Sequence, residues 1–514
     1  MKRERWGSKL GVILAVAGSA VGLGNFLRFP VQAVKNGGGA FMIPYFISLF
    51  LLGIPLMWIE WTIGRFGGGF GHGTAPGIFH TLWNKNRFIK YFGVIGIFGP
   101  IVIFIYYTYI ESWLLAYVFF PLRSDFSLIS TKDEMVAFLQ GYQGIVKNQY
   151  FSSILPAYFF FLITFFLNVF IVYYGIKKGI ENVCKFAMPA LFIFALILVI
   201  RVLTLKNQLE PSWTPLNGLG FLWNPDFSSL KDAKVWLSAS GQIFFTLSVG
   251  IGVILTYASY LSKDDDVLLS GLTSASANEF AEVILGGSIV IPASYVFFGP
   301  VGIKEVANQG AFNLGFVTMP LILKSIPLGK IFEILWFFLL FLAGLTSSIS
   351  LAQPAIAFLE DEFNLSKKKS VLIFGIITFL LSNLSILFLS KGVVDELDFW
   401  GGTFSLVIFG TIETILFAWV FGMERAWEEM HSGSDITLPG IYKFIIKYIT
   451  PLFLLFILIS WTVQYAIPTL LLKNVPEENI PFVLMTRIIL LLLFIGLCIL
   501  VKISWDKKGE KIET

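Results

Sequence analysis

A long apolar segment near the start of the chain is interrupted by glycines and polar residues. The apolar run extends from about Leu10 to Phe50, and residues 18–30 within it read GSAVGLGNFLRFP. Each glycine costs roughly 1 kcal/mol of helix propensity relative to alanine. Non-helical backbone at membrane depth is tolerated only where it lines a protein-buried or water-filled cavity. The stretch from Ala20 to Gly24 therefore predicts a membrane helix that is broken at a binding site.

A second stretch repeats this pattern. VGIG at 249–252 nearly copies VGLG at 21–24, and both lie in the middle of long apolar segments. Polar residues stand beside both: Asn25 follows the first copy, and Thr246 and Ser248 precede the second. Glycine-rich faces also serve ordinary packing of membrane helices. Two interrupted helices in corresponding positions of two halves, however, are typical of the binding site of a secondary transporter.

The composition places the chain in a membrane. Of its 514 residues, 56% are hydrophobic and 14% are charged, whereas soluble globular chains carry about 25% charged residues. The net charge of +4 is small and gives no reason to expect a nucleic-acid partner. Cys184 and Cys498 both lie in apolar context, so neither a disulfide framework nor a metal cluster is expected. We expect an all-α polytopic protein embedded in a lipid bilayer.

Twelve apolar segments are long enough to cross a bilayer as helices. They cover residues 10–36, 40–69, 88–121, 154–173, 181–204, 235–259, 267–299, 328–359, 370–389, 396–421, 444–465 and 481–503. Helices 1–5 and 6–10 each begin with a broken helix, and because five is odd, the second set enters the membrane in the opposite sense. This is an inverted repeat with the site between its halves, near the midplane. The expected divisions are a tail at 1–9, repeats at 10–204 and 235–421, helices 11 and 12 at 444–503, and a tail at 504–514.

Basic residues predict the orientation of the chain. Lysine and arginine cluster before helix 1, between helices 2 and 3, after helix 4, before helix 9 and in the final tail. By the positive-inside rule, these loops and both termini are cytoplasmic, in the inner (plasma) membrane of the cell. The start, MKRERWGSKL, is not followed by a short apolar core and a cleavage site, so we interpret it as a retained tail. The loop at 300–327 keeps apolar residues and is expected to form an outer lid.

Polar residues within the spans indicate a cation site. Asn25, Thr246 and Ser248 stand beside the breaks, and Asn278 and Glu282 share one face of helix 7 at spacing i and i+4. The amide, hydroxyl and backbone carbonyl oxygens available here are hard ligands. No His or Cys, which softer transition metals prefer, accompanies them. A small hard cation such as sodium is therefore favoured.

Helix 8 carries a further set of oxygen ligands in AGLTSSIS. Thr346 and Ser347 offer hydroxyls, and Ala343 offers a carbonyl on the same side. Hydroxyls in helices often bond to their own backbone instead, and the sequence leaves the two alternatives open. An anionic substrate would balance a bound cation, and the positive ends of half-helices suit a carboxylate. Together these features suggest an amino acid as the substrate.

Acidic residues within spans are functional candidates by default. Glu60 and Glu282 either pair electrostatically, are protonated or carry transported protons, and the sequence does not decide among these roles. The three histidines, His72, His80 and His431, lie in expected cytoplasmic loops and receive no role.

Two pairs of opposite charges lie at the ends of the expected cavity. Arg28 and Asp398 belong at its outer end, and Arg3 and Asp361 at its inner end. Each pair either forms a charged latch or anchors its helices at the membrane interface.

Eight ordered sequence blocks resemble one family of membrane transporters. They are GSAVGLGNFLRFP, NGGGAFMIPY, IPLMWIEW, YYTYIESW, GQIFFTLSVG, SGLTSASANEFAEVILGG, FLAGLTSSIS and DFWGGT. Together they resemble the neurotransmitter:sodium symporters, most of all the bacterial leucine-transporting branch. The resemblance implies the LeuT fold, in which helices 1 and 6 are broken, and sodium-coupled symport by alternating access.

The resemblance also implies two sodium sites. The first would use the substrate carboxylate together with Ala20, Asn25, Thr246 and Asn278. The second would use Gly18, Val21, Ala343, Thr346 and Ser347.

The same resemblance implies how a substrate is held. Its carboxylate would meet the backbone amides at Leu23 and Gly24 and the hydroxyl of Tyr107. Its amino group would meet Ala20, Phe245, Thr246 and Ser248. Its side chain would enter a pocket made by Val21, Ile103, Phe245, Ile251, Ser347 and Leu351. Phe245 and Tyr107 would form a thin outer gate, with Arg28–Asp398 outside and Arg3–Asp361 inside as the charged gates.

Departures from the family pattern bear on the substrate and the ions. Gly22 stands where many monoamine-transporting relatives carry Asp, so an amino acid that brings its own carboxylate is favoured. Glu282 stands where chloride-dependent relatives carry Ser, so no chloride requirement is expected. In the pocket, Ile251 replaces a Phe, Ile103 a Val and Leu351 an Ile. One methylene is worth only about 1–3 kcal/mol of discrimination, so the preferred aliphatic amino acid is not fixed.

Alternative functions differ in what they require. A proton-coupled or exchange carrier on the same scaffold needs Glu60 or Glu282 to titrate. A receptor that binds an amino acid without transporting it would be expected to carry a large cytoplasmic signalling tail. An enzyme is not expected, because no span pairs a nucleophile with a base or groups metal ligands. A homodimer is compatible with the sequence, which does not give the oligomeric state.

Overall fold

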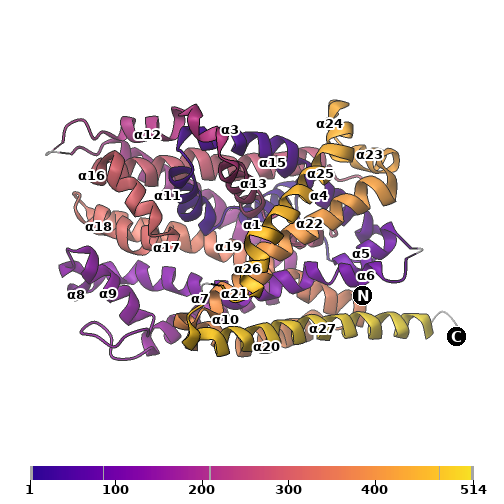
Figure 1. The fold of residues 1–514 in the computed structure, drawn as a ribbon. Helices are drawn as coiled ribbons and strands as arrows, with labels where there is room; N and C mark the ends of the chain where they lie inside the picture. Colours follow the sequence, from indigo (N-terminus) through magenta and orange to yellow (C-terminus); the bar gives the residue numbers. More distant parts are fainter. Residues whose placement is uncertain (1–3, 85, 208–209, 474, 511–514) are drawn as a thin grey trace.

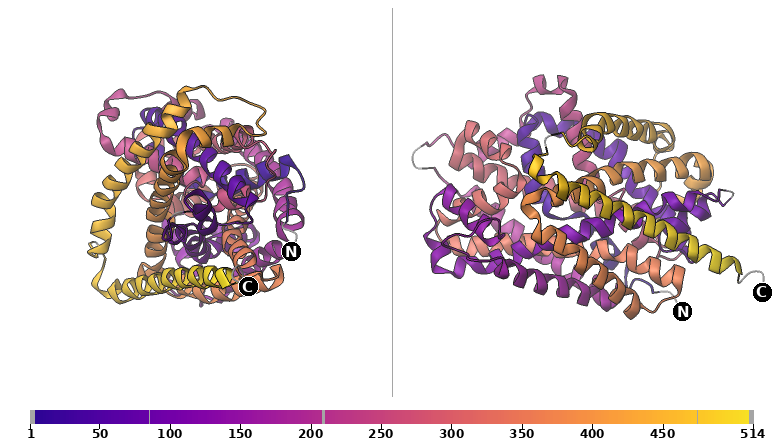
Figure 2. Two further views of the ribbon diagram at one scale, coloured as in Figure 1. Left: turned by 90° about the vertical axis from the view of Figure 1, so that its right-hand side faces the viewer. Right: turned by 60° about the horizontal axis from the view of Figure 1, so that its bottom comes forward.

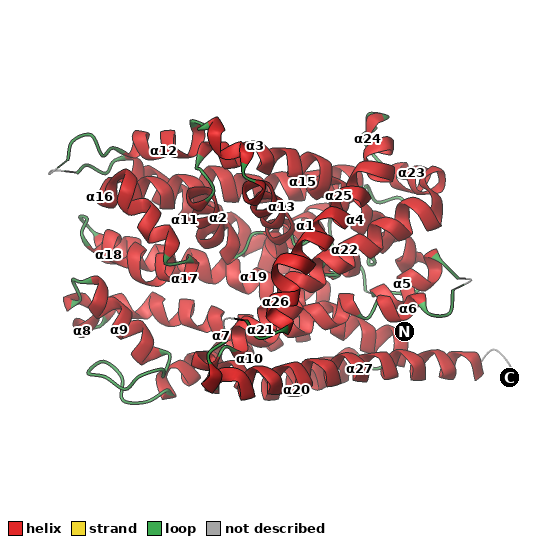
Figure 3. Cartoon of the chain, viewed as in Figure 1, coloured by secondary structure: helices red, strands yellow, loops and turns green. Residues whose placement is uncertain are grey.

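The computed structural model describes residues 4–84, 86–207, 210–473 and 475–510. Within this part of the chain the regular structure is helical throughout, and Figure 3 shows helices joined by loops with no strand. One isolated bridge pairs Gly38 with Pro225. The all-α prediction is confirmed.

Ten helical segments of the described chain are long and apolar enough to cross a membrane. They are Gly39–Gly69, Ile89–Leu122, Leu155–Tyr173, Ile176–Leu203, Leu268–Asn308, Gly329–Phe363, Lys367–Leu387, Val393–His431, Ile441–Leu470 and Glu477–Lys507. An eleventh span is a bent pair, Lys9–Ala20 with Gly24–Lys35, whose axes differ by 45°.

The remaining expected span, the sixth in chain order at 235–259, consists of two shorter helices. These are α13 (Ala233–Leu247) and α14 (Val253–Ala258). Neither half is long enough to cross a membrane alone, because the break that the glycines predicted lies between them. The two interruptions therefore occur where the sequence placed them.

The principal helices form one bundle (Figure 1). They are α1 (Lys9–Ala20), α2 (Phe29–Lys35), α3 (Gly39–Ser48), α4 (Ile54–Gly69), α7 (Ile95–Phe119), α10 (Leu155–Tyr173), α11 (Asn182–Leu203), α13, α14, α15 (Leu268–Glu279), α16 (Gly287–Asn308), α19 (Gly329–Phe363), α20 (Lys367–Leu387), α22 (Ser405–Ile415), α25 (Thr450–Trp461) and α27 (Ile480–Glu510). Shorter helices include α5 (Ala75–Leu82), α8 (Ser124–Leu128), α9 (Lys132–Tyr142), α12 (Pro215–Trp223), α17 (Ala311–Asn313), α18 (Met319–Lys324), α21 (Val393–Leu397) and α23 (Met423–His431).

The helices differ in how deeply they lie in the bundle. The most apolar part of α19 is 83% buried, whereas that of α27 is 22% buried. In Figures 1 and 2, α27 runs along one edge of the molecule. Helix α19 is therefore central, and α27 is left to face lipid.

The first break follows α1 directly. Val21 is extended, with φ −72° and ψ 95°, and a π-helical turn at Gly24–Arg28 then leads into α2. The break interrupts the α-helical hydrogen bonding, and the backbone N–H of Gly22 instead donates to the side-chain oxygen of Asn25 at 2.8 Å. Within a membrane span, peptide groups at a break need partners from the protein or from a ligand.

The second break needs residues that adopt positive φ angles. Ser248, Gly250 and Gly252 have φ values of 53°, 75° and 90°. A Cβ on Gly250 would overlap the carbonyl oxygen of Leu406, and a Cβ on Gly252 would come within 2.5 Å of the carbonyl oxygen of Gly96. Glycine is thus required at both positions for conformation and for space.

Candidate functional site

A cavity of about 300 Å³ lies between the two breaks. It is lined by residues of both interrupted helices and of α7, α17, α19, α21 and α22. Every residue predicted to bind substrate lines it except Val21, which is fully buried behind the surface. The residues that meet at the cavity are Ala20, Gly22, Leu23, Gly24, Ile103, Tyr107, Phe245, Thr246, Ser248, Ile251, Ser347 and Leu351.

The cavity wall is apolar in one part and polar in another. Ile103, Ile251 and Leu351 contribute aliphatic surface. Near the first break, a Cβ built on Gly22 would lie 2.9 Å from the Ser347 hydroxyl and 3.3 Å from the Tyr107 hydroxyl. The absence of a side chain at Gly22 therefore leaves the room in front of these two hydroxyls.

Side chains join the two breaks to each other. The Ser248 hydroxyl donates to the carbonyl oxygen of Ser19 at 2.9 Å. The hydroxyl of Ser19 in turn lies 2.8 Å from that of Ser350 on α19. The broken helices and α19 are thus connected at the cavity.

The predicted ligands of the first sodium site converge. The side-chain nitrogen of Asn25 donates to the side-chain oxygens of Asn278 and Thr246, at 2.8 and 3.2 Å. The side-chain oxygen of Asn278 also lies 3.2 Å from the carbonyl oxygen of Ala20 and 3.1 Å from that of Thr246. Oxygens at this spacing repel unless a donor or a cation stands among them. The side-chain oxygens of Asn25, Thr246 and Asn278 and these two carbonyl oxygens form an oxygen set that fits sodium.

Glu282 lies directly behind this group, fully buried. It accepts hydrogen bonds from Gln242 at 3.0 Å, from Tyr45 at 2.9 Å and from the Thr246 hydroxyl. A carboxyl group therefore touches Thr246, the residue that the two asparagines share.

Four of the five predicted ligands of the second sodium site, Gly18, Ala343, Thr346 and Ser347, lie close together. The Ser347 hydroxyl lies 3.0 Å from the carbonyl oxygen of Ala343 and 3.3 Å from that of Gly18. The Thr346 hydroxyl lies 3.2 Å from the Ala343 carbonyl and 3.1 Å from the Leu342 carbonyl, one turn earlier. The bonds to Leu342 and Ala343 join each hydroxyl to the backbone of its own helix, which is the alternative that the sequence left open. The neutral oxygen set fits a sodium ion, because hard cations prefer such ligands.

The outer charges both line the cavity but are not paired with each other. The Arg28 guanidinium lies 3.9 Å from the centre of the Phe245 ring. Asp398 instead accepts a hydrogen bond from the Tyr106 hydroxyl at 2.6 Å. Among the described residues no ion pair joins Arg28 to Asp398, because each is held by an aromatic neighbour.

The start of the described chain packs against the second half of the second broken helix, α14. Arg3 lies outside the described residues, so its pairing with Asp361 stays a prediction. The indole nitrogen of Trp6 donates to the carbonyl oxygen of Tyr257 at 3.0 Å, and the two rings meet edge-on at 5.2 Å.

Several residues around the site were missed from the sequence. Glu60 was singled out as an acid, but not as the acceptor for the backbone N–H of Gly250, at 2.5 Å. Glu279 accepts from the Tyr45 hydroxyl at 2.7 Å. Tyr45 and Glu279 both stand inside sequence blocks that resemble the family, and Gln242 precedes Thr246 by one helical turn. These positions in the sequence were the evidence from which Tyr45, Glu279 and Gln242 could have been identified.

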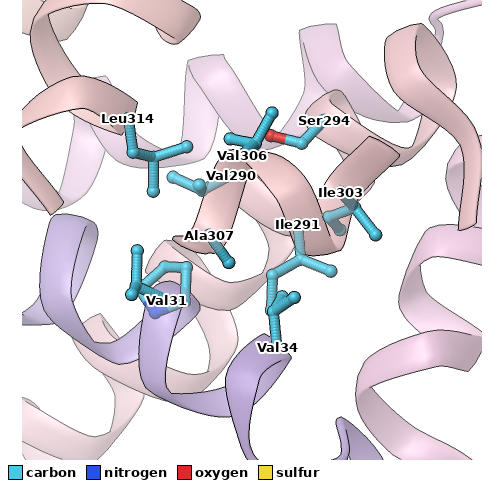
Figure 4. A pocket seen from close by; sticks show the side chains of 10 residues that line it. Val31, Val34, Val290, Ile291, Ser294, Ile303, Val306, Ala307 and Leu314 are labelled. Carbon is cyan, nitrogen blue, oxygen red and sulfur yellow. The ribbon is translucent and has the colours of Figure 1, made fainter. Parts of the chain in front are cut away.

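A second cavity, between α2 and α16, is apolar and small (Figure 4). Its volume is about 10 Å³, which is roughly the room that a single water molecule needs. We assign no ligand to it.

Comparison with known proteins identifies the family to which the chain belongs. The model of the sodium:neurotransmitter symporter family matches residues 3–137 and 151–505. The chain belongs to this family. Symporters similar to it include an uncharacterized sodium-dependent transporter of Methanocaldococcus jannaschii, 31% identical over 88% of this chain and 89% of that protein. One of Haemophilus influenzae is 29% identical over 89% of this chain and 98% of that protein.

A solved structure shares the fold of this symporter. It is the crystal structure of MhsT in complex with L-phenylalanine, with a TM-score of 0.75 and 31% identity, covering 89% of this chain and 99% of that chain. The predictions of a polytopic LeuT fold and of a sodium-dependent membrane transporter are confirmed.

Proposed function

We propose that this symporter couples the inward movement of sodium to the uptake of an apolar, leucine-like amino acid by alternating access. The observation that carries the proposal is the convergence of two oxygen-ligand sets on a cavity between two broken helices. The aliphatic surface of Ile103, Ile251 and Leu351 supports an apolar side chain. The phenylalanine bound by MhsT extends the candidates to aromatic amino acids.

The proposal assigns the ions as follows. Sodium site one comprises Ala20, Asn25, Thr246 and Asn278, and sodium site two comprises Gly18, Val21, Ala343, Thr346 and Ser347. Glu282 supplies the negative charge that chloride would otherwise provide, which its contact with Thr246 supports. The chain is expected in the plasma membrane with both termini cytoplasmic, and a homodimer is compatible with the exposed face of α27.

The test is equilibrium binding of labelled leucine to the purified protein in sodium or potassium, with each of the twenty amino acids as competitor. We expect binding in sodium only, displaced best by aliphatic or aromatic amino acids. Equal binding in potassium would contradict sodium coupling and favour a proton-coupled carrier. Binding without uptake in vesicles would favour a receptor.

A pair of variants tests the direct ligand role. Asn25→Ala should weaken sodium and leucine binding together, because the substrate carboxylate and the amide share one ion. Thr378→Ala is the matched control, since this buried hydroxyl bonds only to backbone of its own helix, α20, at 2.8 and 3.4 Å. Leucine affinity independent of sodium in Asn25→Ala and the parent alike would contradict the proposal.

A further inference from the structure

The carboxyl group of Glu181 binds the residues that immediately precede α1 to the turn that leads into α11 (Asn182–Leu203). Glu181 ends a π-helical turn, Ile176–Glu181, that leads into α11. Its Oε2 accepts the backbone N–H of Gly7 at 2.6 Å, and its Oε1 accepts the Ser8 hydroxyl at 2.9 Å. Glu181 is only 1% exposed, whereas its donors Gly7 and Ser8 are exposed and half-buried, so the contact lies where the start of the chain meets the bundle.

Ser8 connects Glu181 to the first turn of α1. Ser8 is the N-cap of α1, and its side-chain oxygen accepts the backbone N–H of Gly11 at 3.0 Å. A Cβ on Gly11 would overlap the Glu181 carboxyl group, so the first turn of α1 packs directly on it. The carboxyl group therefore fixes both the cap and the first turn of this half-helix.

The half-helix that is held in this way carries binding residues at its other end. Helix α1 has 12 residues and includes Gly18 and Ala20, and the extended residue Val21 follows it. The backbone is broken at Val21 and Gly22, so the break supplies a hinge between α1 and the helical residues that follow it. An inward opening of α1 would have to separate Ser8 from Glu181.

We propose that Glu181 is a positioning residue that holds α1 in the closed inner position, and that its contact with Gly7 and Ser8 must break before the cavity opens inward. This inference rests on the proposed alternating-access function. It differs from the expected charged gate, because its donors are a backbone amide and a capping hydroxyl.

Lys185 provides a matched control on the same carboxyl group. Its Nζ lies 2.6 Å from Oε1 of Glu181 at spacing i, i+4, and its side chain is 38% exposed. Lys185 belongs to α11, so removing it leaves both donors from the start of the chain in place. The contact with Gly7 and Ser8 therefore depends on Glu181 and not on Lys185.

The chain contains its own reporter for the test. Cys184 is fully buried and lies three residues after Glu181, on the same helical face. In a Cys498→Ser background, Cys184 is the single thiol. The rate at which N-ethylmaleimide labels it measures how often this region opens.

We expect Glu181→Gln to accelerate labelling about ten-fold, the effect of losing one hydrogen bond to a charged group. Ser8→Ala should accelerate it as well, and the two effects should be less than additive, because both changes act on the hydrogen bond between Ser8 and Glu181. Lys185→Gln should leave the rate unchanged, and saturating sodium with leucine should slow it in every variant. If Glu181→Gln does not fold, Ser8→Ala carries the test.

Two results would overturn the proposal. They are labelling rates for Glu181→Gln or Ser8→Ala equal to that of the parent, and equal acceleration by Lys185→Gln. The labelling rate without ligand does not depend on transport, so it separates this proposal from the proposed function. Failure of the latter would appear as leucine binding that ignores sodium, with the labelling differences intact.

Discussion

The hydroxyl of Ser248 donates to the carbonyl oxygen of Ser19 across 2.9 Å, and this bond joins the second broken helix to the first. Ser248 adopts a left-handed conformation with φ 53° to make it. A non-glycine residue at positive φ costs roughly 1–2 kcal/mol. The cost is offset where the side chain binds a carbonyl that the break in the first helix has exposed.

Removing the Ser248 hydroxyl is expected to weaken leucine binding about two- to ten-fold, the effect of one neutral hydrogen bond. Ser248→Ala and Ser248→Gly should weaken it alike. They should differ in stability, because glycine relieves the left-handed strain and alanine keeps it. Leucine titrations and melting curves measure the two effects. Unchanged affinity in both variants would mean that the bond does not shape the cavity.

Gly22 and Gly24 stand two residues apart but face different surroundings. A Cβ on Gly22 would lie 2.9 Å from the Ser347 hydroxyl, whereas a Cβ on Gly24 would meet only Phe245, at 3.7 Å. We expect Gly22→Ala to weaken leucine binding by about 1–3 kcal/mol, as overpacking does. Gly24→Ala, with ordinary van der Waals contact, is the control and should bind nearly as the parent does. Equal affinities for the two variants would contradict this reading of the cavity.

The sequence predicted the breaks because glycine and polar residues inside an apolar span leave few other structures. VGLG at 21–24 and VGIG at 249–252 marked both interruptions correctly, and spacing alone placed Asn278 and Glu282 on one face. These are local properties of a helix, so the sequence carries them directly.

Contacts between distant helices were not predictable in the same way. Nothing near Glu181 in the sequence points to Gly7 and Ser8, about 170 residues earlier. Likewise, Arg28 and Asp398 were expected to face each other as charges. Their aromatic neighbours Phe245 and Tyr106 hold them apart, which only the packing of the side chains reveals.

Glu282 should determine whether leucine binding depends on chloride. In the parent we expect the same sodium-dependent leucine binding in chloride and in gluconate, since a carboxyl group already contacts Thr246. Glu282→Ser removes that group and leaves donors from Tyr45 and Gln242 facing the space. An anion should then be needed, so binding should fall in gluconate and recover in chloride. Chloride dependence of the parent, or indifference of the variant, would contradict the assignment.

Glu60 and Glu413 are both fully buried but differ in their partners. Glu60 accepts the backbone N–H of Gly250, whereas among the described residues neither carboxyl oxygen of Glu413 has a hydrogen-bond partner. Glu60→Leu leaves a buried N–H unsatisfied and should destabilise the protein by about 1–3 kcal/mol. Glu413→Leu removes an unpartnered polar group and should be neutral or stabilising, as replacement of buried charged groups by apolar ones often is.

Melting curves of Glu60→Leu and Glu413→Leu test this contrast. A third variant, Glu60→Gln, tests whether an uncharged acceptor is enough. The glutamine keeps an acceptor for Gly250, so it should restore most of the stability that Glu60→Leu loses. Glu60→Leu should also weaken leucine binding, because Gly250 stands between Ser248 and Ile251 and both of these residues line the cavity. Glu60→Gln should restore that binding. If Glu413→Leu lowered the melting temperature as far as Glu60→Leu does, the carboxyl of Glu60 would have no special part in holding the second break. Equal losses in Glu60→Gln and Glu60→Leu would show that the amide acceptor is not what the break requires.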